Sequence, residues 1–115
     1  SEVSYIASQS DPSANKFVFA YTITITNRGN LSARLTDRHW IITDSTGKIE
    51  EVKGEGVVGE QPVLDPGEEF EYTSGSHLKT EMGTMHGSYQ MINDQGESLE
   101  VEIPCFTLSV PGILN

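Results

Sequence analysis

The sequence predicts an all-β protein, an antiparallel β-sandwich of about seven strands. The segment from Phe17 to Thr26 places a large apolar residue at every second position, which is the period of a half-buried strand. Clusters of Gly, Pro, Asn and Asp separate this segment from others of similar pattern, and no stretch of useful length has the helical period. A five-stranded barrel is the competing architecture, since periodicity alone does not separate the two.

Composition sets the domain count and the class of partner. The chain has 115 residues, so we expect a single domain spanning 1–115. Its formal net charge of -10, from 7 Lys and Arg against 17 Asp and Glu, argues against a nucleic-acid surface, which needs a basic patch. The single cysteine, Cys105, makes no internal disulfide, and no apolar run is long enough for a membrane helix. We therefore expect a cytoplasmic protein that binds neither nucleic acid nor membrane.

Alternating patterns place the main strands. We expect them at 17–27, 36–44, 68–74, 84–93 and 98–109, with a short exposed strand at 48–53 and an edge strand at 3–7. Trp40, the only tryptophan, is expected to fill the space between two sheets. The predicted core consists of Phe19, Tyr21, Ile23, Trp40, Leu64, Phe70, Tyr72, Tyr89, Val101 and Phe106.

Turn and bulge signals complete the topology. Pro66 and Gly67 suit the two central positions of a type I or II turn, and 93–96 has the composition of a hairpin turn. In the last strand the apolar positions change from odd to even numbers at Pro104, which predicts a bulge at Pro104 and Cys105. The weakly patterned segment 76–80 is expected to be an irregular loop.

The segment from Gly54 to Gly59 matches the letters of the dinucleotide-binding pattern GxGxxG. That pattern binds pyrophosphate where a strand meets a helix N-terminus, and Gln61-Pro62 followed by Pro66 excludes a helix here. We expect the glycines to serve a connection between strands. In the alternative, the amides of Gly54, Gly56 and Gly59 form a small anion nest that binds a phosphate compound.

A combination of motifs resembles the ApaG domain family over nearly the whole chain. It comprises the glycine segment with Gln61-Pro62, Leu64 with Pro66-Gly67, Tyr72-Thr73-Ser74-Gly75, Met85 with Gly87 and Tyr89, and Ile103-Pro104 with Phe106. The resemblance implies an immunoglobulin-like or fibronectin-III-like sandwich without a firmly assigned activity. It also implies a link to cobalt resistance and magnesium efflux, the phenotypes associated with bacterial members, and a kinship with domains attached to F-box adaptor proteins.

Motifs for catalysis or metal binding are weak. The spacing of His39, His77 and His86 matches no zinc motif, so we expect surface histidines and no metal site. The run from Ser74 to His77 places hydroxyls beside an imidazole, but adjacent residues on a strand or loop seldom face each other. Cys105 is expected to be a small buried apolar residue. The sequence therefore predicts no enzyme and no cofactor.

Carboxylate clusters leave one cation alternative open. Glu68, Glu69 and Glu71, or Glu50 and Glu51, could bind a divalent cation weakly, although such clusters are usually solvated faces.

Two functional classes remain. The favoured one is a protein–protein interaction module with an unidentified, transiently bound partner; the other is a small-ligand or cation-responsive protein. Val57 and Val58 are neighbours in a glycine-rich connection, so at least one should be exposed, and replacing both by serine is expected to spare the melting temperature. The candidate partner surface comprises Glu55, Val57, Val58, Gln61, His77 and Leu78.

Overall fold

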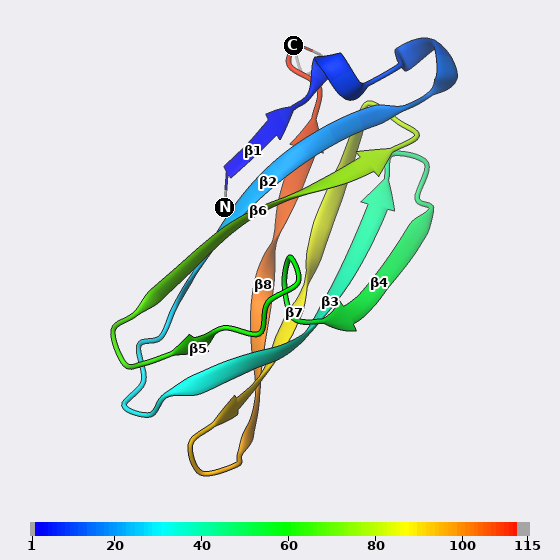
Figure 1. Ribbon diagram of the computed structural model, residues 1–115. Coiled ribbons are helices and arrows are strands. Elements are labelled where there is room, and N and C mark those ends of the chain that lie inside the picture. Colours follow the sequence, from blue (N-terminus) through cyan, green and yellow to red (C-terminus); the bar gives the residue numbers. More distant parts are fainter. Residues whose placement is uncertain (1, 113–115) are drawn as a thin grey trace.

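The computed structural model describes residues 2–112 as two antiparallel sheets that pack face to face (Figure 1). The smaller sheet has the order β1-β2-β6, with β1 at Glu2–Tyr5, β2 at Phe17–Thr26 and β6 at Glu69–Leu78. The larger sheet has the order β4-β3-β7-β8, with β4 at Ile49–Glu55, β3 at Ala33–Asp44, β7 at Met82–Asn93 and β8 at Ser98–Ser109. A two-residue strand, β5 (Val63–Leu64), also pairs with β3. The predicted sandwich is confirmed.

Helical structure within residues 2–112 is limited to two short 3-10 turns, Ala7–Gln9 and Pro12–Ala14. Neither is long and apolar enough to span a membrane.

Strand β2 forms one wall of the core because its alternation points every odd-numbered side chain from Phe17 to Ile25 inward. The long strands β3, β7 and β8 face it. The buried apolar residues are Phe17, Phe19, Tyr21, Ile23, Ile25, Ala33, Leu35, Trp40, Ile42, Val57, Leu64, Tyr72, Leu78, Met85, Tyr89, Met91, Ile103 and Leu108. Of the predicted core, Phe70 and Phe106 are half-buried.

Trp40 fills the space between the sheets, as predicted. Its side chain is 2% exposed. Its rings meet those of Tyr21 and Phe106 edge-on, with centroids 5.4 and 5.9 Å apart. Offset and edge-on contacts of this kind add to the stabilisation that burial of the rings already provides.

The predicted bulge in β8 is confirmed, but the burial expected around it is not. Between the pairs Met85–Phe106 and Gly87–Ile103, β8 has two residues, Pro104 and Cys105, where β7 has only His86. Because Cys105 belongs to the bulge, its side chain lies on the solvent side and is exposed, so the predicted buried cysteine is wrong.

Val101 was predicted in the core and is 38% exposed. It lines a hollow with Ile25, Leu31 and Leu99, so it faces the opposite sheet. On the side of β2 that faces away from β6, however, β1 pairs only with 19–22, and no strand within residues 2–112 lies beside 23–26 on that side. The larger sheet therefore extends beyond the edge of the smaller sheet, and Val101 is left partly exposed.

Two strand boundaries also differ from the expectation. β6 continues through Ser76–Leu78, the segment predicted as a loop, because Phe17, Val18 and Phe19 of β2 pair with it residue by residue. β3 begins at Ala33 and contains an irregularity at Thr36, between the pairs of Leu35 and Asp37 with β7.

The turn at Pro66 and Gly67 is as predicted: Glu68 N donates to Asp65 O, and Gly67 has a φ of +86°.

Candidate binding crevice

The glycine segment is a strand end followed by a tight turn (Figure 1, between β4 and β5). Val57 N donates to Glu60 O and Glu60 N to Val57 O, which closes a two-residue turn over Val58 and Gly59. Both central residues have positive φ, 44° and 80°, as in a type I′ turn. No α-helix follows among the described residues, so the structural role predicted for the glycines agrees with the observed geometry.

Each of the first two glycines makes room for a specific neighbour. A Cβ at Gly54 would lie 2.8 Å from Nη2 of Arg38, whose guanidinium crosses the strand there. A Cβ at Gly56 would lie 2.2 Å from Glu60 O, and its own amide donates to Thr36 O. The amides of Gly56, Val57 and Glu60 are thus already engaged, which removes donors from the alternative of an anion nest.

The two valines of this segment have opposite environments. Val57 is 1% exposed and belongs to the core, whereas Val58 at the turn is 52% exposed. The expectation that at least one is exposed is confirmed. The expectation that both can become serine without loss of stability is wrong, because the turn folds back and buries Val57. Leu78 of the candidate surface is likewise buried, since it ends β6 opposite Phe17.

Val58 is a conformational outlier. A left-handed φ costs an L-residue about 1–2 kcal/mol, and β-branched residues rarely adopt it. Type I′ turns prefer Asn-Gly, which accepts this conformation readily. The protein thus holds an exposed apolar side chain at a position where asparagine would fit better.

Arg38 stands on the core-facing side of β3, two residues before Trp40. Its Nη1 donates to Glu55 O and Gly56 O, both at 3.0 Å, which fixes the guanidinium against the glycine segment. No carboxylate within residues 2–112 forms an ion pair with it, and its Nε and Nη2 have no hydrogen-bond partner there. Arg38 therefore combines a fixed position with a free bidentate edge.

A crevice opens between β6 and β4, the neighbouring edges of the two sheets, and encloses about 240 Å³. Trp40, Tyr21 and Met85 form its apolar floor, and the walls come from Glu50 and Val52 on β4. On the other side lie the four residues Ser74–His77 of β6. Arg38 lines the crevice as well, so the glycine segment to which it is bonded lies at that end of the opening.

Positive charge gathers along this opening. A hollow of about 60 Å³ adjoins the crevice at Glu50 and His77 and adds Lys48, Lys79 and Asp44 to its lining. With Arg38, three of the seven Lys and Arg residues line the two hollows. Asp44 is already engaged, because its Oδ1 accepts from Thr46 N, Thr46 Oγ1 and Lys48 N. Glu50 lines both hollows, so two carboxylates accompany the three basic side chains, and Arg38 forms an ion pair with neither of them.

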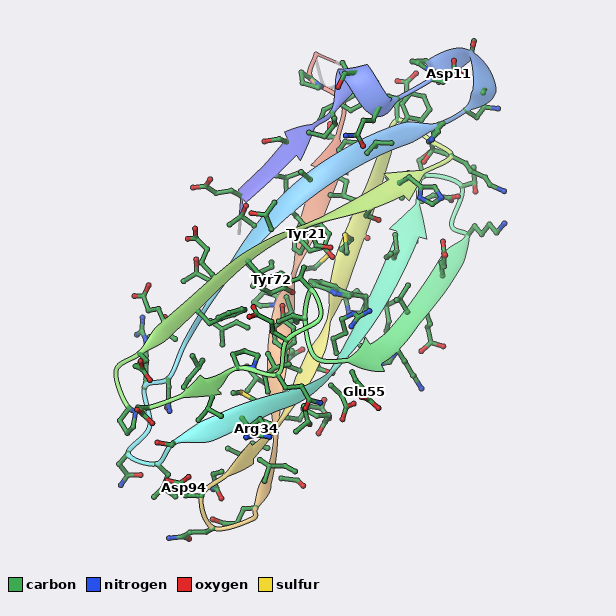
Figure 2. The ribbon with its side chains drawn as sticks, viewed as in Figure 1. Asp11, Tyr21, Arg34, Glu55, Tyr72 and Asp94 are labelled. Atoms are coloured by element: carbon green, nitrogen blue, oxygen red, sulfur yellow. The ribbon has the colours of Figure 1, made fainter. Side chains whose placement is uncertain are left out.

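Tyr21 lies in the floor of the crevice, and two further tyrosines, Tyr72 and Tyr89, are buried in the core; Figure 2 labels Tyr21 and Tyr72 in the middle of the molecule. The hydroxyls of Tyr72 and Tyr89 hydrogen-bond to each other in the core. Burial raises the pKa of Tyr72 to about 12 and raises that of Tyr89 as well. Burial also raises the pKa of Tyr21, and the nearby Ser74 hydroxyl and the charge of Arg38 act in the opposite direction.

This tyrosine pair predicts an alkaline loss of stability. Because the folded state holds Tyr72 and Tyr89 neutral, the unfolded chain releases protons first, and the melting temperature should fall as pH rises from about 10 to 12. In the double variant Tyr72→Phe, Tyr89→Phe this fall should be shallower. At pH 7 the double variant should be nearly neutral, whereas Tyr72→Phe alone should cost about 1–3 kcal/mol by stranding the other hydroxyl. If the melting temperature of the wild type and of the double variant fell equally with pH above about 10, the two tyrosines would not cause the alkaline loss of stability.

The candidate surface is thus divided. Glu55, Val58 and Gln61 are exposed at the glycine segment, where Gln61 Nε2 donates to Thr36 O (Figure 2 labels Glu55). His77 is exposed at the other end of the crevice. His77 and Arg38 both line the crevice, and Arg38 is hydrogen-bonded to the glycine segment.

Sequence reasoning missed Arg38 as a site residue. The available signal was its position: a charged residue at the same strand parity as Trp40 and Ile42 must face the core or the edge of the core. The hydroxyls of Ser74 and Ser76, which the sequence places near an imidazole, lie on the crevice wall, and Ser74 lines the crevice together with Tyr21.

The histidines do not converge. His39 Nε2 lies 2.6 Å from Glu51 Oε1 on the outer face of the larger sheet, while His77 is on β6 of the other sheet. Within residues 2–112, no three His, Cys, Asp or Glu side chains come together in a way that could hold a metal ion.

Comparison with known proteins identifies the family. The ApaG domain model matches residues 7–93. The Protein ApaG of Thiobacillus denitrificans is 59% identical over 111 residues, which cover 96% of this chain and 87% of the relative, and that of Azoarcus is 56% identical over the same shares. The solved structure of an ApaA protein from Bordetella pertussis superposes with a TM-score of 0.92 at 50% identity, covering 96% of this chain and 90% of that one. The chain therefore belongs to the ApaG domain family.

Proposed function

We propose that this protein is a non-enzymatic interaction module that binds a partner protein through the Val58 turn and the adjoining crevice. One observation carries the proposal: Val58 is apolar, half exposed and held at a φ of 44°. Backbone strain at an exposed position persists where the side chain has a use outside the domain. A partner in cation homeostasis would connect this role with the cobalt and magnesium phenotypes of bacterial members of the family.

The alternative, a small-ligand protein that uses the glycine amides or the acidic surface, has less support. The amides of Gly56 and Val57 already donate to Thr36 O and Glu60 O. Ser74, Ser76 and His77 all line the crevice, but within residues 2–112 no hydrogen bond joins either hydroxyl to the imidazole, so these residues do not suggest a nucleophile with its base.

Val58→Asn tests the proposal. Asparagine tolerates the left-handed conformation, so the variant should be as stable as the wild type or more stable by about 1 kcal/mol, while partner binding should weaken. Loss of the apolar anchor should reduce capture at least about tenfold, as for other contact residues at the centre of an interface. The measurement is affinity capture from a lysate with quantitative mass spectrometry, alongside thermal melts.

The matched control is Ile49→Asn. Ile49 is 63% exposed and sits at the other end of β4, paired with Thr43. A protein retained by the wild type and by Ile49→Asn, but lost with Val58→Asn, is the expected result. If both variants retain the same proteins, the turn is not the contact.

A further inference from the structure

The free edge of Arg38 is the starting point for an inference about the partner. Its Nη1 donates one hydrogen bond to the carbonyl of Glu55 and one to the carbonyl of Gly56. A guanidinium has five N–H donors, so the Nε and Nη2 side remains, and this side matches the two oxygens of a carboxylate. The charge has no ion-pair partner within the described part of the chain, although 17 Asp and Glu residues are available.

The guanidinium is also fixed in advance. Gly54 leaves the space in which it lies, and two backbone carbonyls hold it. An arginine that is already ordered loses little conformational entropy when it binds, so each hydrogen bond to a ligand contributes more.

The edge of β6 that borders the crevice is unpaired within the described residues. β6 is the last strand of its sheet, and no backbone partner within 2–112 covers the side of Thr73–Ser76 that faces away from β2. Native sheet edges are usually blocked by charges, proline or bulges. Across the crevice, β4 is the edge strand of the larger sheet and carries Glu50, Glu51 and Lys53. The segment Thr73–Ser76 of β6 carries no charge and no proline. This segment is open to pairing with another strand.

We propose that the crevice binds an extended acidic peptide segment of a partner protein, whose backbone pairs with β6 at Thr73–Ser76 and whose carboxylate side chain is bound by Arg38. The hydroxyls of Ser74 and Ser76, the nearby Lys79 and His77, and Glu50 on the β4 side form a polar rim over the apolar floor, and because Glu50 repels a carboxylate, the acidic side chain is placed at the Arg38 end. Successive side chains of a bound peptide strand point to opposite faces. When the acidic side chain faces the crevice, the residues directly before and after it therefore face away from the crevice. This inference rests on the proposed function and specifies its ligand.

The test uses the blocked peptide acetyl-Thr-Val-Glu-Val-Thr-amide, in which the Glu side chain carries the only charge. Trp40 lines the crevice and is the only tryptophan, so its fluorescence reports occupancy. We expect saturable binding with a Kd below about 1 mM. The matched peptide with Gln in place of Glu should bind at least about tenfold more weakly.

Variants locate the contact. Arg38→Gln should weaken binding of the Glu peptide at least about tenfold and leave binding of the Gln peptide unchanged. Arg34→Gln is the matched control: Arg34 is exposed on the same strand, between the buried residues Ala33 and Leu35, and binding should be retained. Should Arg38→Gln fail to fold, the comparison of the two peptides on the wild-type protein decides alone.

Further ligands distinguish the occupant. Backbone N-methylation of the peptide should abolish binding if β6 pairs with it. Equal affinity of the Glu and Gln peptides, absence of saturable binding by the Glu peptide, or no effect of N-methylation would overturn the inference. So would binding of free succinate or inorganic phosphate as tight as that of the Glu peptide, which would assign the crevice to small anions. A partner lost with Val58→Asn but indifferent to Arg38→Gln would leave the proposed function standing and remove only this ligand.

Discussion

Replacing Trp40 by alanine should lower the free energy of unfolding by about 3–5 kcal/mol. The side chain is 2% exposed and contacts aromatic rings from both sheets and from three strands, Tyr21, Tyr89 and Phe106. Its removal therefore leaves a cavity in the middle of the sandwich, and the surrounding rigid sheets relax only in part.

Urea denaturation followed by circular dichroism measures this effect, since the variant has no tryptophan to report by fluorescence. Ile49→Ala is the control: at 63% exposure it should change the unfolding free energy by less than about 0.5 kcal/mol. A loss below about 1 kcal/mol for Trp40→Ala would mean that the indole does not join the two sheets.

The second large effect is expected from Gly87→Ala on β7. A Cβ at this position would lie 1.9 Å from His39 O and 3.1 Å from the Cα of Trp40, both backbone atoms of the paired strand β3. Because β3 and β7 are interior strands with partners on both sides, neither can move away freely. We expect a destabilisation at the upper end of the range for overpacking, about 3 kcal/mol.

Gly75→Ala provides the matched control within β6. Its Cβ would meet its nearest neighbour, Phe19 O, at 3.5 Å, which is an ordinary contact. This variant should be neutral within about 0.5 kcal/mol, since alanine also restricts the unfolded chain. Chemical denaturation of both variants checks the pair; equal effects would show that close backbone approach at Gly87 does not constrain the sheet.

Alternation in the sequence predicts much of this fold because one face of each strand is buried. In β2 it sets the register over the whole strand, and in β8 the change of parity at Pro104 locates the bulge. It fails at Ser76–Leu78, which is held in a strand by pairing with β2, since three residues are too few to show an alternation of their own. It also fails at Val101, whose exposure depends on how far the opposite sheet extends.

The candidate site was harder to predict. The sequence marks the glycine segment and suggests that a valine there is exposed, but it does not show that the turn buries Val57 and presents Val58. That choice follows from the positive φ values at Val58 and Gly59, which no local pattern specifies. The role of Arg38 depends on contacts with carbonyls 17 and 18 residues away. Such contacts exist only once β3 and β4 have paired.

The proposed binding face is tested most directly by site-specific photo-crosslinking in cells. A benzophenone-bearing residue replaces Val58 in one variant and Ile49, the exposed residue at the other end of β4, in a second. We predict a discrete covalent adduct with a partner protein from position 58 and none from position 49. Adducts from position 49 alone, or equal adducts from both positions, would contradict a binding face at the Val58 turn.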